Sequence, residues 1–304
     1  MAVDHADISD IFVDHVNDPH SLHNPCLKSN VICTSAEFGK IWVPKEAQKE
    51  AFVFKMFGQV SNKDCFAAAD GGWSPTNNPY NKPFADGAEL SISLAYPKLC
   101  TPLKREWPAA IKQLKGLIFG EVELSLPLKG AWIPETDNTS GYGRIRLKHA
   151  FFQEQESGAH SVESPIPWDH WPVSDAAKPS FNRLRDADTH DLVPLPVFDM
   201  DGKLLQPSQY RSALMNTVVE AHFTLEVWRF GGRSQTFKAR IVKLYIVTKP
   251  LMILIDSPTK RPRVDSEDEN SPLKKRRTTS SSQGSGTSSS QKSVASSSQG
   301  SKET

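Results

Sequence analysis

The chain has 304 residues and nearly balanced charge, with 36 lysines and arginines against 35 aspartates and glutamates. Nine of the basic and six of the acidic residues lie from Asp256 onward, so residues 1–255 hold 27 basic and 29 acidic side chains. A diffuse positive field over the body is therefore excluded, and nucleic-acid contact there would require a local basic patch.

The first segment, residues 1–38, is predicted to be a lead-in to the folded body. It has neither a basic leader nor an apolar run, so we expect no secretory signal. The longest apolar stretch near the tail, Leu251–Ile255, is too short to span a bilayer, and we expect no membrane partner.

A loose cluster of metal-capable residues lies in this lead-in: His15, His20, His23, Cys26 and Cys33. A structural zinc site usually takes two separated pairs of ligands, and the second pair is missing here. We therefore expect no metal and no cofactor. The four cysteines are irregularly spaced in a large chain, which favours reduced thiols.

Residues 39–255 are predicted to form a β-rich body, because alternation of apolar and polar residues is its main pattern. Strands are expected at Phe52–Phe57, Glu89–Tyr96, Glu121–Leu128, Arg144–His149, Leu192–Phe198 and Lys203–Leu205. Short helices are expected at Pro108–Lys115, stopped by Gly116, and at Ser208–Met215. Two long loops, residues 61–87 and 153–191, separate these elements.

The clearest element is a hairpin formed by Thr217–Phe230 and Thr236–Val247. In its second strand Phe237, Ala239 and Ile241 are expected to face inward, and then the phase slips so that Val242, Leu244 and Ile246 do. A slip of one residue predicts a β-bulge, which bends a strand as a barrel wall requires. We therefore predict a mainly β fold, a Greek-key or OB-like barrel or sandwich with long loops.

The outer face of this hairpin is the predicted binding surface. Basic side chains interleaved with aromatic rings are typical of single-strand binding, where bases stack on rings and cations follow phosphates. An ordinary solvated sheet face is the alternative, since half-buried sheets normally have polar outer faces. The predicted nucleic-acid-binding residues are Trp228, Phe230, Arg233, Lys238, Arg240, Lys243 and Tyr245, with a second stripe of Tyr142, Arg144, Arg146 and Lys148.

Catalysis finds little support in the sequence. Asp186, Asp188, His190 and Asp191 could bind a metal, and Asp169 with His170 could orient a base. No phosphate-binding glycine loop and no nucleophile or metalloprotease motif completes either set.

The segment from residue 256 to residue 304 is predicted to be a disordered tail, because it has almost no large apolar side chains. Two basic clusters separated by twelve residues resemble the bipartite nuclear import signals that importin alpha reads, which predicts a nuclear location. The clusters consist of Lys260, Arg261, Lys274, Lys275, Arg276 and Arg277. Between them, Ser257 and Ser266 resemble kinase sites, and phosphate there would partly neutralise the clusters.

The strand Val218–Leu225, followed by the strand Phe237–Val247, resembles a pattern in uncharacterised proteins of mushroom-forming basidiomycete fungi. The resemblance implies a strand-rich body and, in some of those proteins, a basic tail. It implies no activity, site or cofactor.

These patterns together predict a non-enzymatic nuclear nucleic-acid-binding protein that prefers single strands of DNA or RNA. A nuclear protein-interaction scaffold using the same sheet is the alternative, and a metal-dependent enzyme with its site around Asp186–Asp191 is the third hypothesis.

Overall fold

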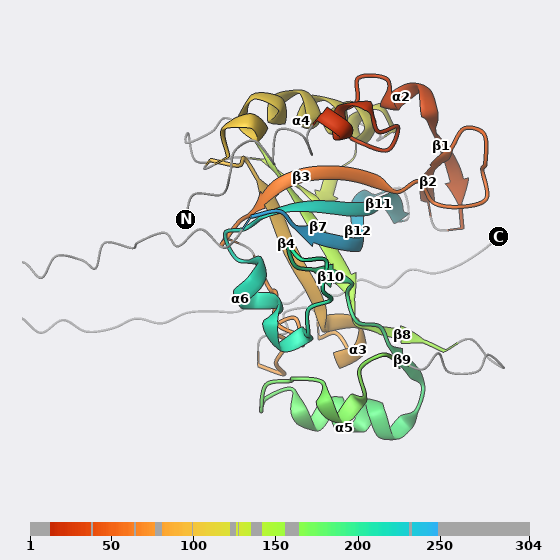
Figure 1. Ribbon diagram of the computed structural model, residues 1–304. Coiled ribbons are helices and arrows are strands. Elements are labelled where there is room, and N and C mark those ends of the chain that lie inside the picture. Colours follow the sequence, from red (N-terminus) through yellow and green to blue (C-terminus); the bar gives the residue numbers. More distant parts are fainter. Residues whose placement is uncertain are drawn as a thin grey trace, which may run out of the picture. The chain divides into compact units, whose positions relative to one another are not determined.

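The computed structural model describes residues 13–37, 39–63, 65–76, 81–98, 100–121, 126, 128–134, 142–155, 164–230 and 233–248 (Figure 1). The chain divides into two units, Met1–Ile253 and Leu254–Thr304, and all of the described residues belong to the first. The predicted tail, residues 256–304, lies outside the described residues.

Strands make up most of the regular structure. The strands are β1 (Val31–Ala36), β2 (Gly39–Pro44), β3 (Phe54–Val60), β4 (Glu89–Ala95), β5 (Leu128–Gly130), β6 (Trp132–Ile133), β7 (Arg144–Ala150), β8 (Phe152–Glu154), β9 (His190–Leu192), β10 (Val197–Phe198), β11 (Val218–Phe230) and β12 (Ser234–Ile246). The helices are α2 (Leu27–Asn30), α3 (Phe84–Gly87), α4 (Thr101–Glu121), α5 (Lys178–Ala187) and α6 (Tyr210–Leu214), with 3₁₀ turns η1 (Trp168–His170) and η2 (Pro207–Gln209).

Five strands close into a barrel in the order β3, β4, β7, β12, β11 and back to β3. Every neighbouring pair is antiparallel except β7 and β12, which pair in parallel through Lys148 and Arg240. In chain order the ring therefore reads first, second, third, fifth, fourth, which is the Greek-key arrangement of an OB-like barrel. The predicted fold class is confirmed. β1 and β2 extend the sheet beyond β11.

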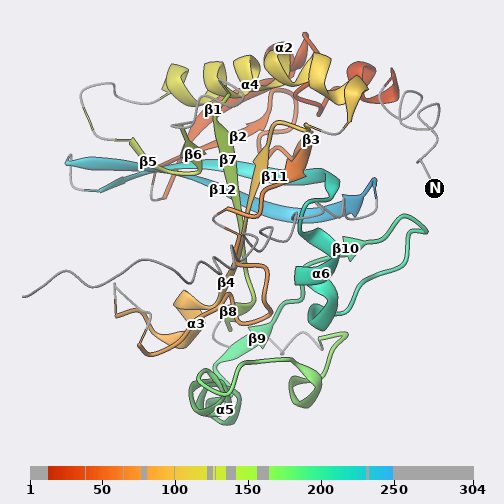
Figure 2. The same ribbon diagram turned by 90° about the vertical axis from the view of Figure 1, so that its left-hand side faces the viewer.

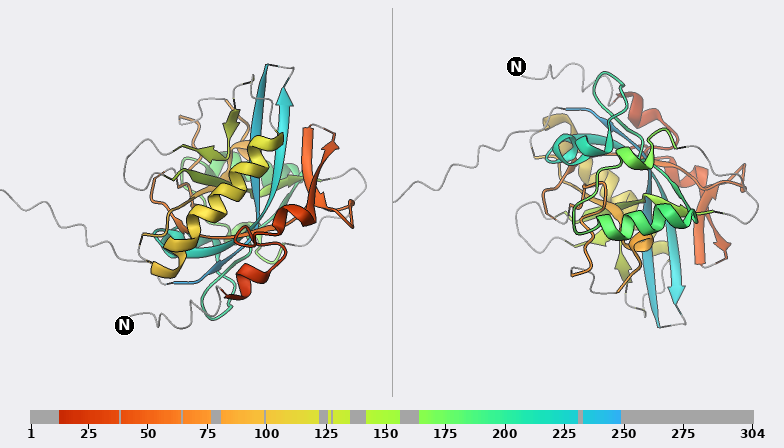
Figure 3. Two further views of the ribbon diagram at one scale, coloured as in Figure 1. Left: turned by 90° about the horizontal axis from the view of Figure 1, so that it is seen from above. Right: turned by 90° about the horizontal axis from the view of Figure 1, so that it is seen from below.

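The hairpin β11–β12 is the longest element of the barrel, and its tip projects past the other strands (Figure 3). The predicted bulge is confirmed, since the pairing passes from His222 with Lys243 to Phe223 with Ile241. Val242 is thus the extra residue. Its predicted inward position is wrong, because a bulge residue has no opposite partner to bury it, and Val242 is 39% exposed.

Helix α4 corrects the predicted helix Pro108–Lys115. A single helix of 21 residues runs from Thr101 through Pro108 and Gly116 to Glu121. Glu121, the first residue of the predicted strand Glu121–Leu128, is therefore helical, and most of that predicted strand lies outside the described residues. Burial outweighs local propensity here, because Trp107, Leu114 and other apolar side chains of α4 are buried in the core. Gly58 of β3 leaves the space for Trp107, whose ring atoms would lie 2.9 Å from a Cβ at that position.

The segment from β8 to β9, called the insert below, lies on the other side of the barrel from α4 (Figure 2). It contains η1 and α5, so part of the predicted loop 153–191 is ordered into a small unit. Its core is aromatic: the Trp168 ring centroid lies 5.3 Å from that of Phe181 and 5.6 Å from that of Phe152.

The predicted lead-in supplies structure to the body. Residues 13–17 are helical, Leu22 and Leu27 are buried in the core, and β1 pairs along its length with β2. All four cysteines are among the described residues, and they are not joined in disulfides there. No helix in the described part of the chain is long and apolar enough to cross a membrane.

Candidate nucleic-acid interface

Barrel closure brings the two predicted basic stripes together. Lys148 of β7 pairs directly with Arg240 of β12. Because the two strands are parallel, Arg146 lies level with Lys238, one step further along the same faces. Four cations from segments about ninety residues apart in the sequence thus meet on adjoining strands. Leu147 and Ala239, which alternate with them along the strands, are buried, so the four cations lie on the outer side of the barrel wall.

A groove of about 880 Å³ lies over this junction, with the insert contributing to its lining. Its charged lining is mostly basic: Lys82, Arg146, Lys148, Lys238 and Arg240 against Glu89 and Glu154. Phe152 and Gln153 of β8 also line it. We call this set the basic groove. It is a local basic patch of the kind that nucleic-acid contact on this slightly acidic body would need.

Two carboxylates hold cations of this surface in place. Glu89 Oε2 lies 2.6 Å from Lys148 Nζ, and Glu226 Oε1 lies 3.0 Å from Arg240 Nε. Both cations are about half exposed, at 43% for the Lys148 side chain and 50% for that of Arg240. The carboxylate side chains are more covered, at 28% exposed for Glu89 and 17% for Glu226, so each cation extends from its carboxylate toward solvent.

Lys238 lies against an aromatic ring rather than a carboxylate. Its Nζ is 3.5 Å from the centroid of the Trp228 ring, and the Trp228 Nε1 donates a 2.7 Å hydrogen bond to Glu226. Burial and then the repulsion of Arg240 lower the pKa of Lys238. Glu226 and Glu89 act in the opposite direction and raise it.

The hairpin tip carries the most exposed of the predicted aromatic rings. Phe230, the last residue of β11, is 49% exposed, and Arg233 beside it is also exposed. Trp228 is half-buried, with Lys238 over its ring. Phe230 is therefore better placed than Trp228 to stack on a base.

The remaining predicted residues lie outside the lining of the groove. Tyr245 stacks on Phe198 with ring centroids 5.0 Å apart, and Lys243 Nζ lies 5.2 Å from the Tyr245 centroid. Tyr142 stacks on Tyr96 at 5.5 Å, and Arg144 follows on β7. The structure thus divides the eleven predicted residues between the groove, the hairpin tip and the barrel ends.

Three charged residues of the groove lining, Lys82, Glu89 and Glu154, were missed by the sequence analysis, as was the exposed Phe66 near the groove. Lys82 and Phe66 lie in the loop 61–87, whose unusual length was the only signal of function there. Their positions depend on contacts between distant segments, so no local pattern marks them.

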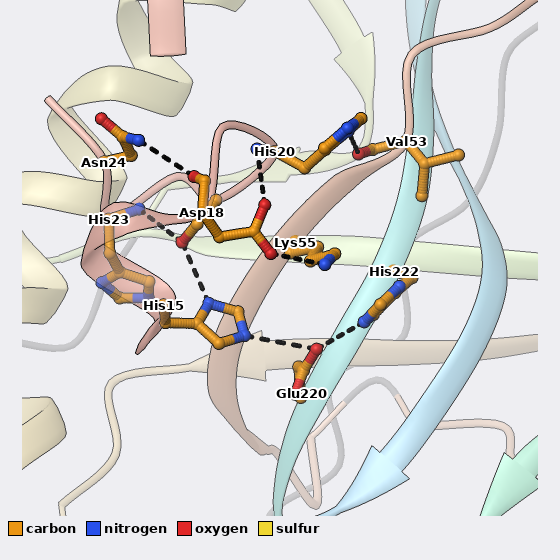
Figure 4. A network of polar contacts seen from close by, with 10 residues as sticks. His15, Asp18, His20, His23, Asn24, Val53, Lys55, Glu220 and His222 are labelled. Carbon is orange, nitrogen blue, oxygen red and sulfur yellow. Dashed lines mark hydrogen bonds and ion pairs between the residues drawn. The ribbon is translucent and has the colours of Figure 1, made fainter. Parts of the chain in front are cut away.

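The metal-capable residues of the lead-in serve structural roles (Figure 4). His15 Nδ1 lies 3.0 Å from Ser21 Oγ, and His15 Nε2 lies 3.2 Å from Glu220 Oε1, which also contacts His222 at 2.5 Å. Burial would raise the pKa of Glu220, but the hydrogen bonds from both histidines outweigh it and lower that pKa. Within the described ranges, no three His, Cys, Asp or Glu side chains converge as metal ligands.

The residues considered for catalysis lie on η1, which carries Asp169 and His170, and on and directly after α5. Arg185 pairs with Asp186 at 3.1 Å and with Asp169 at 2.9 Å, and His190 Nδ1 lies 2.9 Å from Thr189 Oγ1. These are contacts between exposed or half-exposed side chains, and none of these residues lines the groove described above.

Neither a family model nor a curated protein matches the chain. Solved structures similar to it include gp2.5, a single-stranded DNA-binding protein of bacteriophage T7, at 13% identity and a TM-score of 0.35, covering 72% of this chain and 98% of the other. The single-stranded DNA-binding protein of bacteriophage Enc34 is similar at 11% identity and a TM-score of 0.34, covering 78% and 97%. Its complex with single-stranded DNA gives 10% identity, a TM-score of 0.35, and coverage of 72% and 95%. We assign the fold from the strand order and pairing of this chain itself.

Proposed function

We propose that this protein binds single-stranded nucleic acid in the basic groove without acting as an enzyme. The observation that carries the proposal is the meeting of Lys148 and Arg240 where the barrel closes, inside a groove lined by five basic and two acidic side chains. Phosphate contacts of this kind supply most of the affinity of proteins that bind nucleic acid without sequence preference.

The place of the groove on the fold supports the same proposal. In OB-like barrels the face of the second and third strands and the loops beside it bind oligonucleotides. Here those strands are β4 and β7, and Glu89, Arg146 and Lys148 on them line the groove. The exposed ring of Phe230 at the hairpin tip adds a surface on which a base can stack, and stacking is open to unpaired bases.

The test measures binding of labelled oligonucleotides to the full chain, with all nine basic residues from Asp256 onward replaced by glutamine so that no tail cation can bind phosphates. We expect single strands to bind more tightly than duplex at each of two salt concentrations. Lys148→Ala and Arg240→Ala should each reduce the salt slope by about one. Lys203→Ala, an exposed lysine outside the groove, is the matched control and should change nothing.

Two results would contradict this proposal. If the chain shows no affinity for any oligonucleotide at low salt, the basic groove is not a nucleic-acid site, and a protein-interaction scaffold becomes the better hypothesis. If Lys203→Ala weakens binding as much as Arg240→Ala does, the affinity comes from diffuse charge rather than from the groove. Comparing DNA with RNA strands of equal length identifies the preferred sugar.

We also propose that the protein acts in the nucleus and is imported by importin alpha through its tail. The residues concerned lie outside the described part of the chain: Lys260, Arg261, Lys274, Lys275, Arg276, Arg277, Ser257 and Ser266. Replacing both clusters should leave a fluorescent fusion cytoplasmic, and replacing one should give a partial defect, because an extended receptor site sums the contacts of both. Aspartate at Ser257 and Ser266 should weaken import by partly neutralising the clusters.

A further inference from the structure

An exposed phenylalanine lies at the end of the strand pairing that carries the groove cations. Phe66 forms an isolated antiparallel bridge with Ser91 of β4, with its N–H donating to the Ser91 carbonyl at 2.7 Å and its carbonyl accepting from Ser91 N–H at 3.1 Å. The side chain of Phe66 is nevertheless 50% exposed. Single exposed apolar side chains are common on protein surfaces, so exposure alone assigns Phe66 no role, and its position relative to the groove cations decides whether it can contact the same ligand.

The pairing of neighbouring strands places Phe66 in one line with Lys148 and Arg240, the residues proposed to bind phosphates. Ser91 pairs with Lys148, and Lys148 pairs with Arg240. Residues paired across neighbouring strands point to the same face of a sheet, so Phe66, Lys148 and Arg240 lie on the outer face. The Phe66 backbone and the Lys148 backbone are two strand spacings apart, about 10 Å.

The loop that carries Phe66 is held rigidly. The Trp171 Nε1 donates a 3.0 Å hydrogen bond to the Ala69 carbonyl, and the two carboxylate oxygens of Asp70 accept from the backbone N–H groups of Gly72 and Ser174, each at 2.9 Å. Gly71 has φ +62°, and a Cβ there would lie 2.4 Å from the Glu89 carbonyl oxygen, so the turn is packed tightly against β4. The turn that follows Phe66 is thus tied to β4 and to the insert.

We propose that Phe66 is a stacking platform for one base of a single strand whose phosphates contact Lys148 and Arg240. The strand then crosses the barrel wall from β12 over β7 and β4 toward Phe66, across the direction of the β-strands. This inference rests on the proposed function and adds a residue and a path to it. A ring stacks on any base, so this position contributes affinity without sequence preference.

The test compares Phe66→Ala with Phe119→Ala in the full chain with the neutralised tail. Phe119 is also exposed, at 40%, but lies on α4, outside the groove lining. Phe66→Ala should weaken binding of oligothymidine roughly 5- to 140-fold and leave the salt slope unchanged, because it removes stacking and no charge. Phe66→Trp should restore the affinity, and Phe119→Ala should bind as the parent does.

Photo-crosslinking separates stacking from a structural role. An oligonucleotide with 5-iodouracil should crosslink to the peptide that contains Phe66, and the crosslink should disappear when Lys148 and Arg240 are both replaced by alanine. If Phe66→Ala binds as tightly as the parent while Arg240→Ala binds weakly, the proposed stacking on Phe66 is wrong and the proposed binding in the basic groove is supported. If the parent binds no oligonucleotide, the proposed function itself has failed.

Discussion

Two carboxylates lie among the cations of the basic surface, and each holds a side chain that a phosphate would otherwise contact. Glu89 holds Lys148, and Glu226 holds Arg240. In the proposed complex a phosphate competes with these carboxylates, so they lower the affinity for single strands and leave the cations in a binding position.

Glu89→Gln is therefore expected to raise the affinity of the chain for single strands at low salt. It frees Lys148 from a competing carboxylate, whereas the salt slope should stay close to that of the parent, because Lys148 contacts a phosphate in both complexes. Glu121→Gln is the matched control, since Glu121 pairs with Lys40 at 2.8 Å, with similar exposure and outside the groove lining. Equal affinities of Glu89→Gln and the parent would exclude competition by this carboxylate.

The inward face of β11 permits a second prediction at this scale. Phe223 is fully buried and its ring centroid lies 6.0 Å from that of Phe54 on β3. Phe223→Ala should lower the free energy of unfolding by about 3–5 kcal/mol, because it removes a large core side chain. Thr224→Ala, one residue further on the outer face, should change it by less than about 1 kcal/mol in the same denaturant titration.

Among the elements, the hairpin was the most predictable and α4 the least. Alternation over thirteen residues indicates a strand and its buried face at once, and even the bulge appeared as a change of phase. Pro108 and Gly116 suggested helix boundaries, but the burial of Trp107 and Leu114 against the barrel outweighs both residues. Short strands such as β5, β6 and β8 leave too few residues for a period to show.

The bulge itself can be tested by deletion. Removing Val242 would join Ile241 to Lys243, which restores strict alternation and leaves Leu244 and Ile246 on the inner face. The strand would lose the bend that the bulge gives it. We therefore expect the deletion variant to be less stable than Val242→Ala, which keeps the bulge and changes only an exposed side chain, in the same denaturant titration. A deletion variant as stable as Val242→Ala would show that the barrel closes without this bend.

At the scale of the whole molecule, the candidate site was predictable in part. The sequence identified Lys238, Arg240, Arg146 and Lys148 because their outward positions follow from alternation within single strands. It could not show that β7 and β12 pair, nor that the loop 61–87 brings Phe66 beside them, because both depend on closure of the barrel. Alternation within each strand was enough to identify the four cations, whereas the groove between them forms only when the strands pair.

Acid should destabilise the body in a defined window. Burial and then the charge of His15 lower the pKa of His23 from 6.5 to about 3. Between pH 6.5 and pH 3 the unfolded chain therefore protonates His23 and the folded chain does not. The free energy of unfolding falls as the pH is lowered through this range, by roughly 2 kcal/mol at pH 5. Burial lowers the pKa of His149 in the same direction.

His23→Leu should remove the contribution of His23 to this pH dependence of the free energy of unfolding, as measured by urea unfolding at pH 7 and pH 5. The variant should lose less stability than the parent between the two values, whatever its stability at pH 7. If both proteins lose the same free energy of unfolding, His23 is protonated in the folded state, and the assignment of this window to His23 is wrong.

The barrel has a seam. In the described part of the chain β7 and β12 are joined by the pairing of Lys148 with Arg240, whereas β11 and β12 pair along most of their length. Amide hydrogens beside so short a join exchange through small local openings. A nucleic-acid strand bound to both cations would bridge β7 and β12 and so reduce their local opening. A bound oligonucleotide should therefore slow amide hydrogen exchange in β7 near Lys148 and in β12 near Arg240, and leave exchange in the middle of β11 unchanged.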